Sequence, residues 1–513
     1  MNSDLESRIS LVEDFLKSNQ IEEGRRILNE LEAFDPQHFR IIFLSGLVYA
    51  MSGQLNEAAE KFRKVLELNP QHFGAIENLG LCLLKLNKLA EAEIVFKEAL
   101  KTNPESYSVL RALGTITFNL KKFSEAYVYL DQLRKANLLD TQLTINYAYT
   151  LYKVNKVAEA LGLLAEVSAR EPNQYLSFAY QGQILFELKK YPESLKFFDS
   201  VLKIDNNLAE AWSYRALNFL ELERNPEALF AFQKATQLEP KNDAHWANLA
   251  VYFVRNNDKQ KAIECFERCA QICPDLGNYL GALLHMKKFC ADWKGYDDLV
   301  DRIKQGIAQN LLVTFQFDLL SISNSEEELK FNAITNARTL SAPTLPPAIF
   351  PKKPNASKIK IGYLCGEYRN HAIAVCLVGV LENHHRDQFE ILGFDYTPDD
   401  GSEVRQRILK AFDCVHDIKD MNDAQAASFI RQNGVDILID LNGFADRPRP
   451  GVFANRAAPV QVNYLGYPGT QGVDYMDYLI ADLTVIPVSS QSYYKEKIAY
   501  LPHTYMPNDF GKD

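Results

Sequence analysis

A spacing of 34 residues, kept over the first 276 residues, constrains this chain more than any other feature. Prolines recur at multiples of this spacing: Pro36, Pro70, Pro104, Pro172, Pro240 and Pro274. Leu138 and Asn206 stand at the two positions of this series that lack a proline. A small residue lies ten positions after members of the series: Gly46, Gly80, Gly114, Ala148, Gly182, Ala216 and Ala250. A bulky apolar residue comes sixteen positions later: Phe62, Phe96, Leu130, Leu164, Phe198, Phe232 and Phe266. A pattern held in register over such a length indicates one structural unit repeated in tandem.

The repeated unit is predicted to be a pair of antiparallel helices. Small residues let the two helices approach where they cross, and the bulky residue is expected to fill the gap to the next pair. Proline ends the second helix. This is the tetratricopeptide arrangement, and we expect about eight repeats over residues 1–276, including a degenerate one at residues 5–38. Because each repeat contacts only its neighbours, the array is predicted to coil into an α-superhelix with a concave groove.

Such a groove is expected to bind peptide segments of substrate proteins. Asn78, Asn146 and Asn248 occupy one repeat position, two residues before the small residue. We predict that they line the groove and hydrogen-bond a peptide backbone regardless of its sequence. The alternative is that they are ordinary helix-surface amides. Other repeats carry different residues at this position: Leu44, Ala112, Tyr180 and Tyr214.

The 34-residue spacing fades after residue 276. Residues 277–340 are expected to form a helical transition region, in which KKFCADWKGYDDLVDRIKQGI at 287–307 reads as helix. Five prolines between residues 343 and 354 predict an extended linker over residues 341–357. From residue 358 to 513 strands alternate with helices, which predicts a mostly parallel, Rossmann-like sheet. The fold class is therefore mainly α, a repeat superhelix followed by an α/β lobe.

Three loops follow predicted strands of this lobe: GEYRNHA at 366–372, NGFADRPR at 442–449 and GYPGTQG at 466–472. Ligands of parallel sheets bind at the carboxyl ends of the strands, so we expect the loops to form one site. The glycines of the third loop are expected to let the backbone approach a ligand closely. Neither G-x-G-x-x-G nor G-x4-G-K-[ST] occurs in this half, so a nucleotide would need another holder.

These residues resemble the O-GlcNAc transferases of glycosyltransferase family 41. The matching stretches keep the family order over residues 290–505: CADWKGYD, IGYLCGEYRNH, PDDGSEVR, RAAPVQVNYLGYPGTQGVDYMDYLIAD and EKIAYLPHTY. The resemblance implies that residues 358–513 are the first lobe of a GT-B type catalytic domain. It also implies inverting transfer of GlcNAc from UDP-GlcNAc to serine or threonine hydroxyls of proteins. No metal or other cofactor is implied, and UDP-GlcNAc is the donor substrate.

The resemblance also assigns individual residues. It implies that His371 and Glu367 are catalytic, and that Leu465, Gly466 and Pro468 lie against the sugar. Histidine is the side chain most often used to move protons near neutral pH. The alternative for His371 is that it caps a helix N-terminus and only positions other groups.

Departures from the family leave the donor and the acceptor open. Ala372 and Ile373 replace a proline and a threonine of the animal enzymes, and LLVTFQFDLL at 311–320 lacks their histidines. The second family lobe, which holds the uridine and diphosphate, does not follow before Asp513. We expect this chain to be a truncated protein or a natural half-enzyme that binds UDP-sugar only with a second lobe and is inactive alone. The alternatives are a repeat scaffold with a vestigial catalytic lobe and a relative that uses another donor sugar.

Composition limits the partners. The net charge of −10 argues against nucleic acid. MNSDLESRIS is not a secretory signal, and no run of about 18 apolar residues could span a membrane, so we expect a cytoplasmic chain with free thiols and no membrane partner. Cys265, Cys269 and Cys273 are spaced along one helical face. They are predicted to fill a seam between helices, the alternative being a zinc site.

Overall fold

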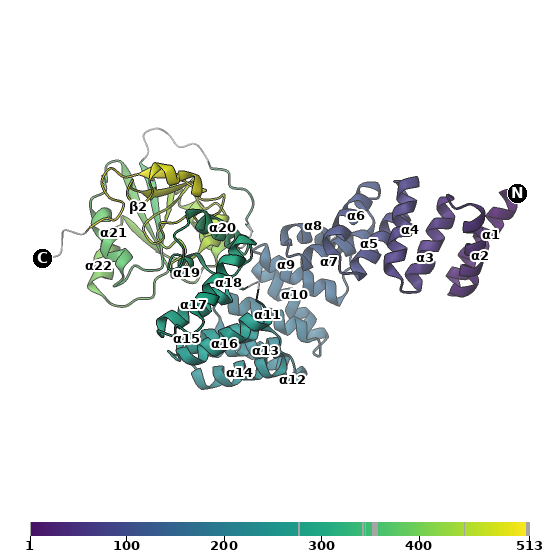
Figure 1. Ribbon diagram of the computed structural model, residues 1–513, viewed down its shortest axis with the longest axis horizontal. Coiled ribbons are helices and arrows are strands. Elements are labelled where there is room, and N and C mark those ends of the chain that lie inside the picture. The colour runs from purple at the N-terminus through teal and green to yellow at the C-terminus, as the bar shows by residue number, and fades with distance from the viewer. Residues whose placement is uncertain are drawn as a thin grey trace. The chain divides into compact units, whose positions relative to one another are not determined.

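The computed structural model describes residues 2–274, 277–340, 343, 345–350, 358–445 and 447–508, with side chains from residue 5 onward (Figure 1). The chain divides into two compact units, Met1–Pro172 and Asn173–Asp513. The predicted linker at residues 341–357 lies mostly outside the described residues. Among the described residues, no helix is both long enough and apolar enough to cross a membrane.

Helix pairs account for the first unit and the start of the second. The first unit contains α1 (Asn2–Lys17), α2 (Ile21–Phe34), α3 (Phe39–Met51), α4 (Leu55–Leu68), α5 (Phe73–Lys85), α6 (Leu89–Thr102), α7 (Tyr107–Asn119), α8 (Phe123–Lys135), α9 (Thr141–Lys153) and α10 (Val157–Arg170). The second unit continues with α11 (Tyr175–Glu187), α12 (Tyr191–Ile204), α13 (Ala209–Glu221), α14 (Asn225–Leu238), α15 (Asp243–Arg255) and α16 (Lys259–Ile272). The helices alternate in the order that the 34-residue spacing predicts.

The turn inside each pair repeats with the same spacing. One residue of every such turn has a positive φ, between 56° and 79°, in the left-handed region: Asn19, Gly53, Asn87, Lys121, Asn155, Lys189, Glu223 and Asn257. Asparagine and glycine adopt this region at little cost, and five of the eight positions carry one of them. Because Asn19 continues the series, the degenerate segment at residues 5–38 turns as the later repeats do.

The small and bulky residues of each repeat pack against each other within one helix pair. A Cβ added at Gly46 would lie 2.7 Å from Cε1 of Phe62, and one added at Gly80 would lie 2.6 Å from Cζ of Phe96. Both phenylalanines are buried. The bulky residue thus also packs against the small residue of its own pair, in addition to the predicted filling of the gap to the next pair.

Alanine substitutions at Gly80 and Gly162 are expected to change stability in opposite directions. At Gly80 the new methyl group would meet the buried ring of Phe96, so overpacking is expected to cost about 1–3 kcal/mol. At Gly162, in α10, a Cβ would meet no described atom within 4 Å, and alanine is expected to stabilise the helix by about 0.5–1 kcal/mol. Hydrogen exchange should become faster over residues 73–102 in Gly80→Ala and slower over residues 157–170 in Gly162→Ala. Unchanged exchange in Gly80→Ala would show that the ring moves aside without cost.

Four further helices follow the array: α17 (Tyr279–Phe289), α18 (Tyr296–Ala308), α19 (Gln316–Leu319) and α20 (Glu326–Ala337). The segment 287–307, which the sequence predicts as helical, is interrupted. Ala291 (φ 52°) and Gly295 (φ 66°) have left-handed backbone conformations, which an α-helix cannot contain. The chain therefore turns between α17 and α18.

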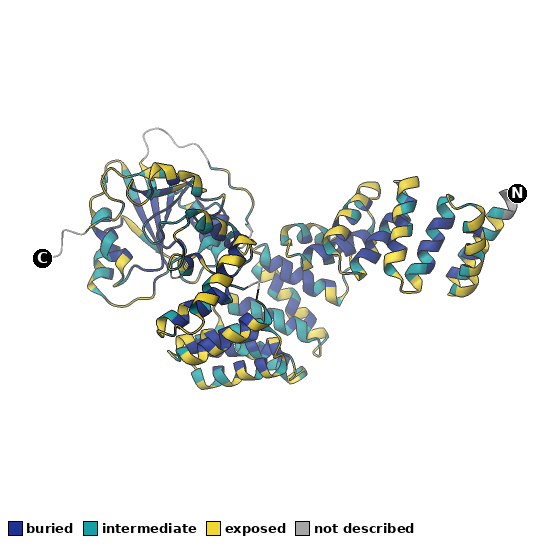
Figure 2. Cartoon of the chain, viewed as in Figure 1, coloured by how far each residue is buried: buried dark blue, intermediate teal, exposed yellow. Residues whose placement is uncertain are grey.

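The lobe that follows is a seven-stranded sheet in which every pairing is parallel, in the order β3-β2-β1-β4-β5-β6-β7. The strands are β1 (Ile359–Cys365), β2 (Phe389–Asp395), β3 (Cys414–Asp417), β4 (Ile437–Asp440), β5 (Val460–Asn463), β6 (Tyr478–Ala481) and β7 (Lys497–Tyr500). The connecting helices are α21 (Ala372–Glu382), α22 (Glu403–Lys410), α23 (Asp423–Gln432), α24 (Pro450–Ala454) and the 3₁₀ helix η1 (Val488–Tyr493). Figure 2 shows buried residues along the strands and exposed residues on the helices.

The strand order fixes where a ligand can bind. From β1 the chain builds β2 and β3 on one side of the sheet and then β4 to β7 on the other. The carboxyl ends of β1 and β4 therefore meet where the order reverses, which is the usual ligand site of open parallel sheets. The short strand β3, at the edge of the sheet, was not predicted, because its four residues are all partly or fully exposed and show no apolar run.

Two of the three cysteines of α16 belong to its packed face. Cys265 and Cys269 are buried, and burial raises the pKa of each thiol to about 12. Cys273, the C-cap of α16, is partly exposed. All three are free thiols, and no group of three or more possible metal ligands occurs among the described residues. The burial of Cys265 and Cys269 agrees with the predicted packing role, whereas Cys273 lies at the end of the helix and is only partly buried.

Candidate functional site

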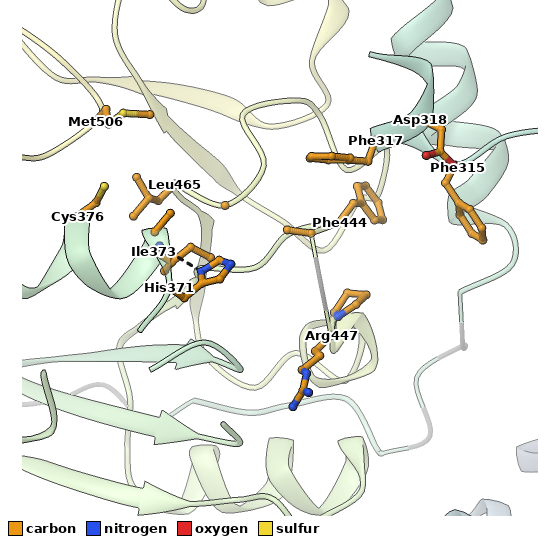
Figure 3. Close-up of a pocket in the computed structure, with 14 residues that line it drawn as sticks. Phe315, Phe317, Asp318, His371, Ile373, Cys376, Phe444, Arg447, Leu465 and Met506 are labelled. Carbon is orange, nitrogen blue, oxygen red and sulfur yellow. Dashed lines mark hydrogen bonds between the residues drawn. The ribbon is translucent and has the colours of Figure 1, made fainter. Parts of the chain in front are cut away.

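The second unit contains a cavity of about 680 Å³ at the carboxyl ends of the strands (Figure 3). The three predicted loops converge on it. His371 and Ala372 come from the first loop, Phe444, Ala445, Arg447 and Pro448 from the second, and Gly466 from the third, with Leu465 directly before it. Residues outside the predicted loops complete the lining: Phe315, Phe317, Asp318, Ile373, Cys376 and Met506.

His371 stands at the start of α21, directly after the loop that leaves β1. Its Nδ1 accepts a hydrogen bond from the backbone N–H of Ile373 at 3.3 Å, which makes His371 the N-cap of the helix. Since Nδ1 is the acceptor, the neutral imidazole carries its proton on Nε2. Figure 3 shows the ring at the cavity, so capping and an active-site position occur together in this residue.

Two glycines of the third loop, Gly466 and Gly472, have protein atoms where a Cβ would stand. A Cβ at Gly466 would lie 2.2 Å from the carbonyl oxygen of Leu441, at the end of β4. At Gly472 (φ 70°) it would lie 2.5 Å from the backbone of Ala333 in α20. These glycines therefore bring the loop against the end of β4 and against α20, and their expected close approach to a ligand remains a prediction.

Leu465 and Gly466 line the cavity, whereas Pro468 does not. Leu465 has φ 73°, a left-handed conformation that is uncommon for a leucine. Strain of this kind persists only where the surrounding structure enforces it. Here the neighbouring Gly466, held against β4, fixes the path of the loop.

Glu367 lies beside the cavity but not in its lining. Its side chain is 1% exposed, and Oε2 accepts a hydrogen bond from Nε of Arg369 at 2.6 Å. Nε of Arg447 lies 3.8 Å from Oε1, which accepts no hydrogen bond among the described residues. Glu367 is thus a buried carboxylate that faces two arginines, and His371 reaches the cavity without it.

Side-chain hydrogen bonds join the three loops below the cavity. Asn442 accepts a hydrogen bond on Oδ1 from the backbone N–H of Gly366 at 3.0 Å, which connects the second loop to the first. Asp440 accepts on Oδ1 from the N–H groups of Asn442 and Gly443, and on Oδ2 from Nε2 of Gln471 at 3.0 Å, which connects the second loop to the third. The walls of the cavity are therefore coupled to each other.

A second buried carboxylate holds the third loop from β7. Oε2 of Glu496 accepts from the hydroxyl of Thr470 and Oε1 from the N–H of Gln471, both at 2.7 Å. Burial raises the pKa of Glu496 and also that of Asp440. Neither residue was predicted from the sequence, because an acidic residue beside a strand is more often exposed, and only the fold turns these two inward.

The apolar part of the lining was also not predicted. Phe315 is the N-cap of α19 and Phe317 is its second residue, and the two side chains are about half exposed, at 53% and 55%. Figure 3 shows Phe317 and Phe444 close together at the rim of the cavity. The sequence feature that could have indicated this apolar lining is a pair of phenylalanines separated by one residue, in a segment without helical periodicity.

The three predicted groove asparagines bond within the array. Asn78 donates to the carbonyl oxygen of Gly74 at 2.7 Å, and Asn248 donates to Oγ of Ser213 at 3.0 Å. Asn146 is 6% exposed and accepts from Gln142 at 3.0 Å. Their role in binding a peptide remains a prediction.

Comparison with known proteins places both parts of the chain. Residues 338–512 match glycosyl transferase family 41. Tetratricopeptide repeats match residues 10–73, 49–115, 147–209, 209–242 and 246–276. The matches divide as the fold does: the repeats match the helix pairs, and glycosyl transferase family 41 matches the parallel lobe and the residues just before it.

Parts of the chain are similar in sequence to named proteins. The chain is 33% identical over 194 residues to the probable UDP-N-acetylglucosamine–peptide N-acetylglucosaminyltransferase SEC of Arabidopsis thaliana, and the match covers 37% of this chain and 20% of that protein. It is 32% identical over 159 residues to the UDP-N-acetylglucosamine–peptide N-acetylglucosaminyltransferase of Caenorhabditis elegans, covering 31% of this chain and 14% of that protein. A solved O-GlcNAc transferase mutant of Thermobaculum terrenum aligns with a TM-score of 0.42 and 23% identity, over 65% of this chain and 58% of that one.

The raised pKa values predict how stability changes with pH. A carboxyl group whose pKa is raised in the folded state stabilises the fold below its unfolded pKa of about 4, and this contribution is lost as the pH rises through the folded pKa. Glu496→Gln stays uncharged, so relative to the wild type it is expected to gain about 1.4 kcal/mol for each unit of raised pKa between pH 4 and pH 8. Calorimetric unfolding at several pH values measures this gain. Glu403→Gln, an exposed residue of the same lobe, is the control, and parallel curves for both variants would contradict the prediction.

Proposed function

We propose that the chain is part of a protein O-glycosyltransferase that transfers GlcNAc from UDP-GlcNAc to serine or threonine hydroxyls with inversion. One observation carries the proposal. In a lobe of family 41, His371 and the Leu465–Gly466 backbone line one cavity at the point where the strand order reverses. The names of the Arabidopsis and Caenorhabditis relatives support the donor and the peptide acceptor.

In this proposal His371 acts at the reacting groups. With its Nδ1 engaged by the N–H of Ile373, Nε2–H is the group that can donate a hydrogen bond into the cavity. Leu465 and Gly466 contact the sugar, and Pro468 shapes their loop from outside the lining. Glu367 is a positioning residue, since its buried carboxylate holds Arg369 and lies near Arg447 instead of entering the cavity.

We further propose that the lobe binds UDP-sugar only together with a second lobe. The lining of the cavity is largely apolar, and Arg447 is its one permanent cation among the described lining residues. Its Nε lies 3.8 Å from the carboxylate of Glu367. A diphosphate requires several charge-assisted hydrogen bonds, which this surface does not offer on its own. The repeats would recruit the acceptor protein.

Calorimetric titration of UDP into the 513-residue chain tests the need for a second lobe. No measurable binding is expected, because the diphosphate would have too few partners. The matched comparison is a longer version that contains a nucleotide-binding lobe, for which binding is expected. Tight stoichiometric binding to the 513-residue chain would overturn this part of the proposal.

Two substitutions of His371 separate its capping role from its chemistry. Asparagine is a good N-cap and alanine is not, so only His371→Ala is expected to lose about 1 kcal/mol of stability. In the longer version, both variants are expected to lower the rate of transfer from UDP-GlcNAc to Ser/Thr peptides at least about a hundredfold. Full activity in His371→Asn would remove the imidazole from the chemistry. No transfer by the longer wild-type protein would favour the alternatives, which are a repeat scaffold with a vestigial lobe or a different donor sugar.

A further inference from the structure

A second cavity, of about 160 Å³, lies in the second unit between α11, α12 and α13. Four aromatic residues are among those that line it: Tyr175, Tyr180, Phe198 and Tyr214. Tyr180 and Tyr214 occupy the repeat position at which Asn78, Asn146 and Asn248 stand in other repeats. These two repeats thus replace the predicted amides by rings, and the rings enclose a hollow.

The aromatic wall is ordered by stacking and burial. The ring of Tyr214 lies parallel to that of Phe198, with an interplanar angle of 3° and centroids 4.9 Å apart. Burial raises the pKa of Tyr214 to about 12, and that of Tyr180 is also raised, so both phenols are neutral. Neutral aromatic faces carry a negative quadrupole that attracts cations.

A negatively charged side chain, Glu210, lies beside the rings, so it attracts cations as the aromatic faces do. Glu210, in the first turn of α13, lines the cavity and is exposed. Glu210 lines the same cavity as Tyr180 and Tyr214, and its negative charge is one cause of the raised pKa of both tyrosines. Within the described residues, Glu210 forms no ion pair, and the lining includes no lysine, arginine or histidine. The cavity therefore presents aromatic faces and a carboxylate without a cation.

We propose that this cavity binds the side chain of a lysine or arginine carried by an extended segment of a partner protein. The carboxylate of Glu210 would pair with the cationic group while the rings cover the aliphatic stem. The cavity, of about 160 Å³, leaves room for the stem of a long side chain. An acidic side chain would meet repulsion from Glu210.

The inference deepens the proposed function, because it names the kind of segment that the repeats would select. It does not depend on sugar transfer for its test. Binding is measured with the 513-residue chain and without a donor, so a failed transferase and a failed cation site give different results.

The probe is a set of seven-residue peptides of random sequence, each mixture having one fixed residue at its centre. Mixtures with central lysine or arginine are expected to bind the wild-type chain most tightly. Glu210→Gln is expected to weaken that binding about two- to fivefold, as for an exposed ion pair. Glu210→Lys is expected to abolish the preference for cations and to favour central glutamate or aspartate.

The matched control is Glu193, which is exposed in the first turn of the neighbouring helix α12 and lies outside the cavity. Glu193→Gln and Glu193→Lys make the same changes of net charge and are expected to leave the preference for central lysine or arginine intact. Equal effects at the two positions would mean that the preference for central lysine or arginine comes from the overall charge of the chain, and this would overturn the proposal. So would the absence of any preference for central lysine or arginine, including the absence of peptide binding.

Discussion

The candidate site depends on a buried carboxylate, that of Asp440 at the end of β4. A carboxylate away from water is costly unless hydrogen bonds replace its hydration. Asp440 receives them from the N–H groups of Asn442 and Gly443 and from the amide of Gln471. Each of these donors belongs to a loop that forms the cavity wall or supports it. The need to satisfy one charge therefore fixes the relative positions of the second and third loops, and Asn442 extends the constraint to the first through Gly366.

In the repeats, a few positions that recur in each helix pair determine how the helices pack. In four pairs a glycine of one helix receives the ring or branched side chain of the other, and a left-handed residue lies in the turn inside each pair. These positions are constrained in every pair, whereas the position two residues before the small residue varies between asparagine, tyrosine and aliphatic residues. Variation at that position gives each stretch of the array its own chemistry. The aromatic cavity beside Glu210 is one result.

Sequence reasoning succeeded where the pattern was local and failed where distant segments meet. The helices of the repeats, six of the seven strands and the convergence of three loops follow from periodicity and from the rule for parallel sheets. Edge strand β3 and the break between α17 and α18 were missed, because four partly exposed residues and an alanine with positive φ leave no distinctive pattern. For the glycines of the third loop, the structure adds a close approach to the backbone after β4 and in α20, which the sequence did not predict.

The sequence by itself determined the two-part architecture, because periodic burial of small and bulky residues depends only on spacing along the chain. It also determined that His371 and the Leu465–Gly466 loop follow the carboxyl ends of parallel strands. Only the tertiary structure decided which groups share the cavity. It placed Phe315 and Phe317 in the lining, buried Glu367 against Arg369, and turned Asp440 and Glu496 toward one loop. The physical reason is that desolvation and hydrogen-bond partners are set by neighbours distant in the sequence, which no local pattern records.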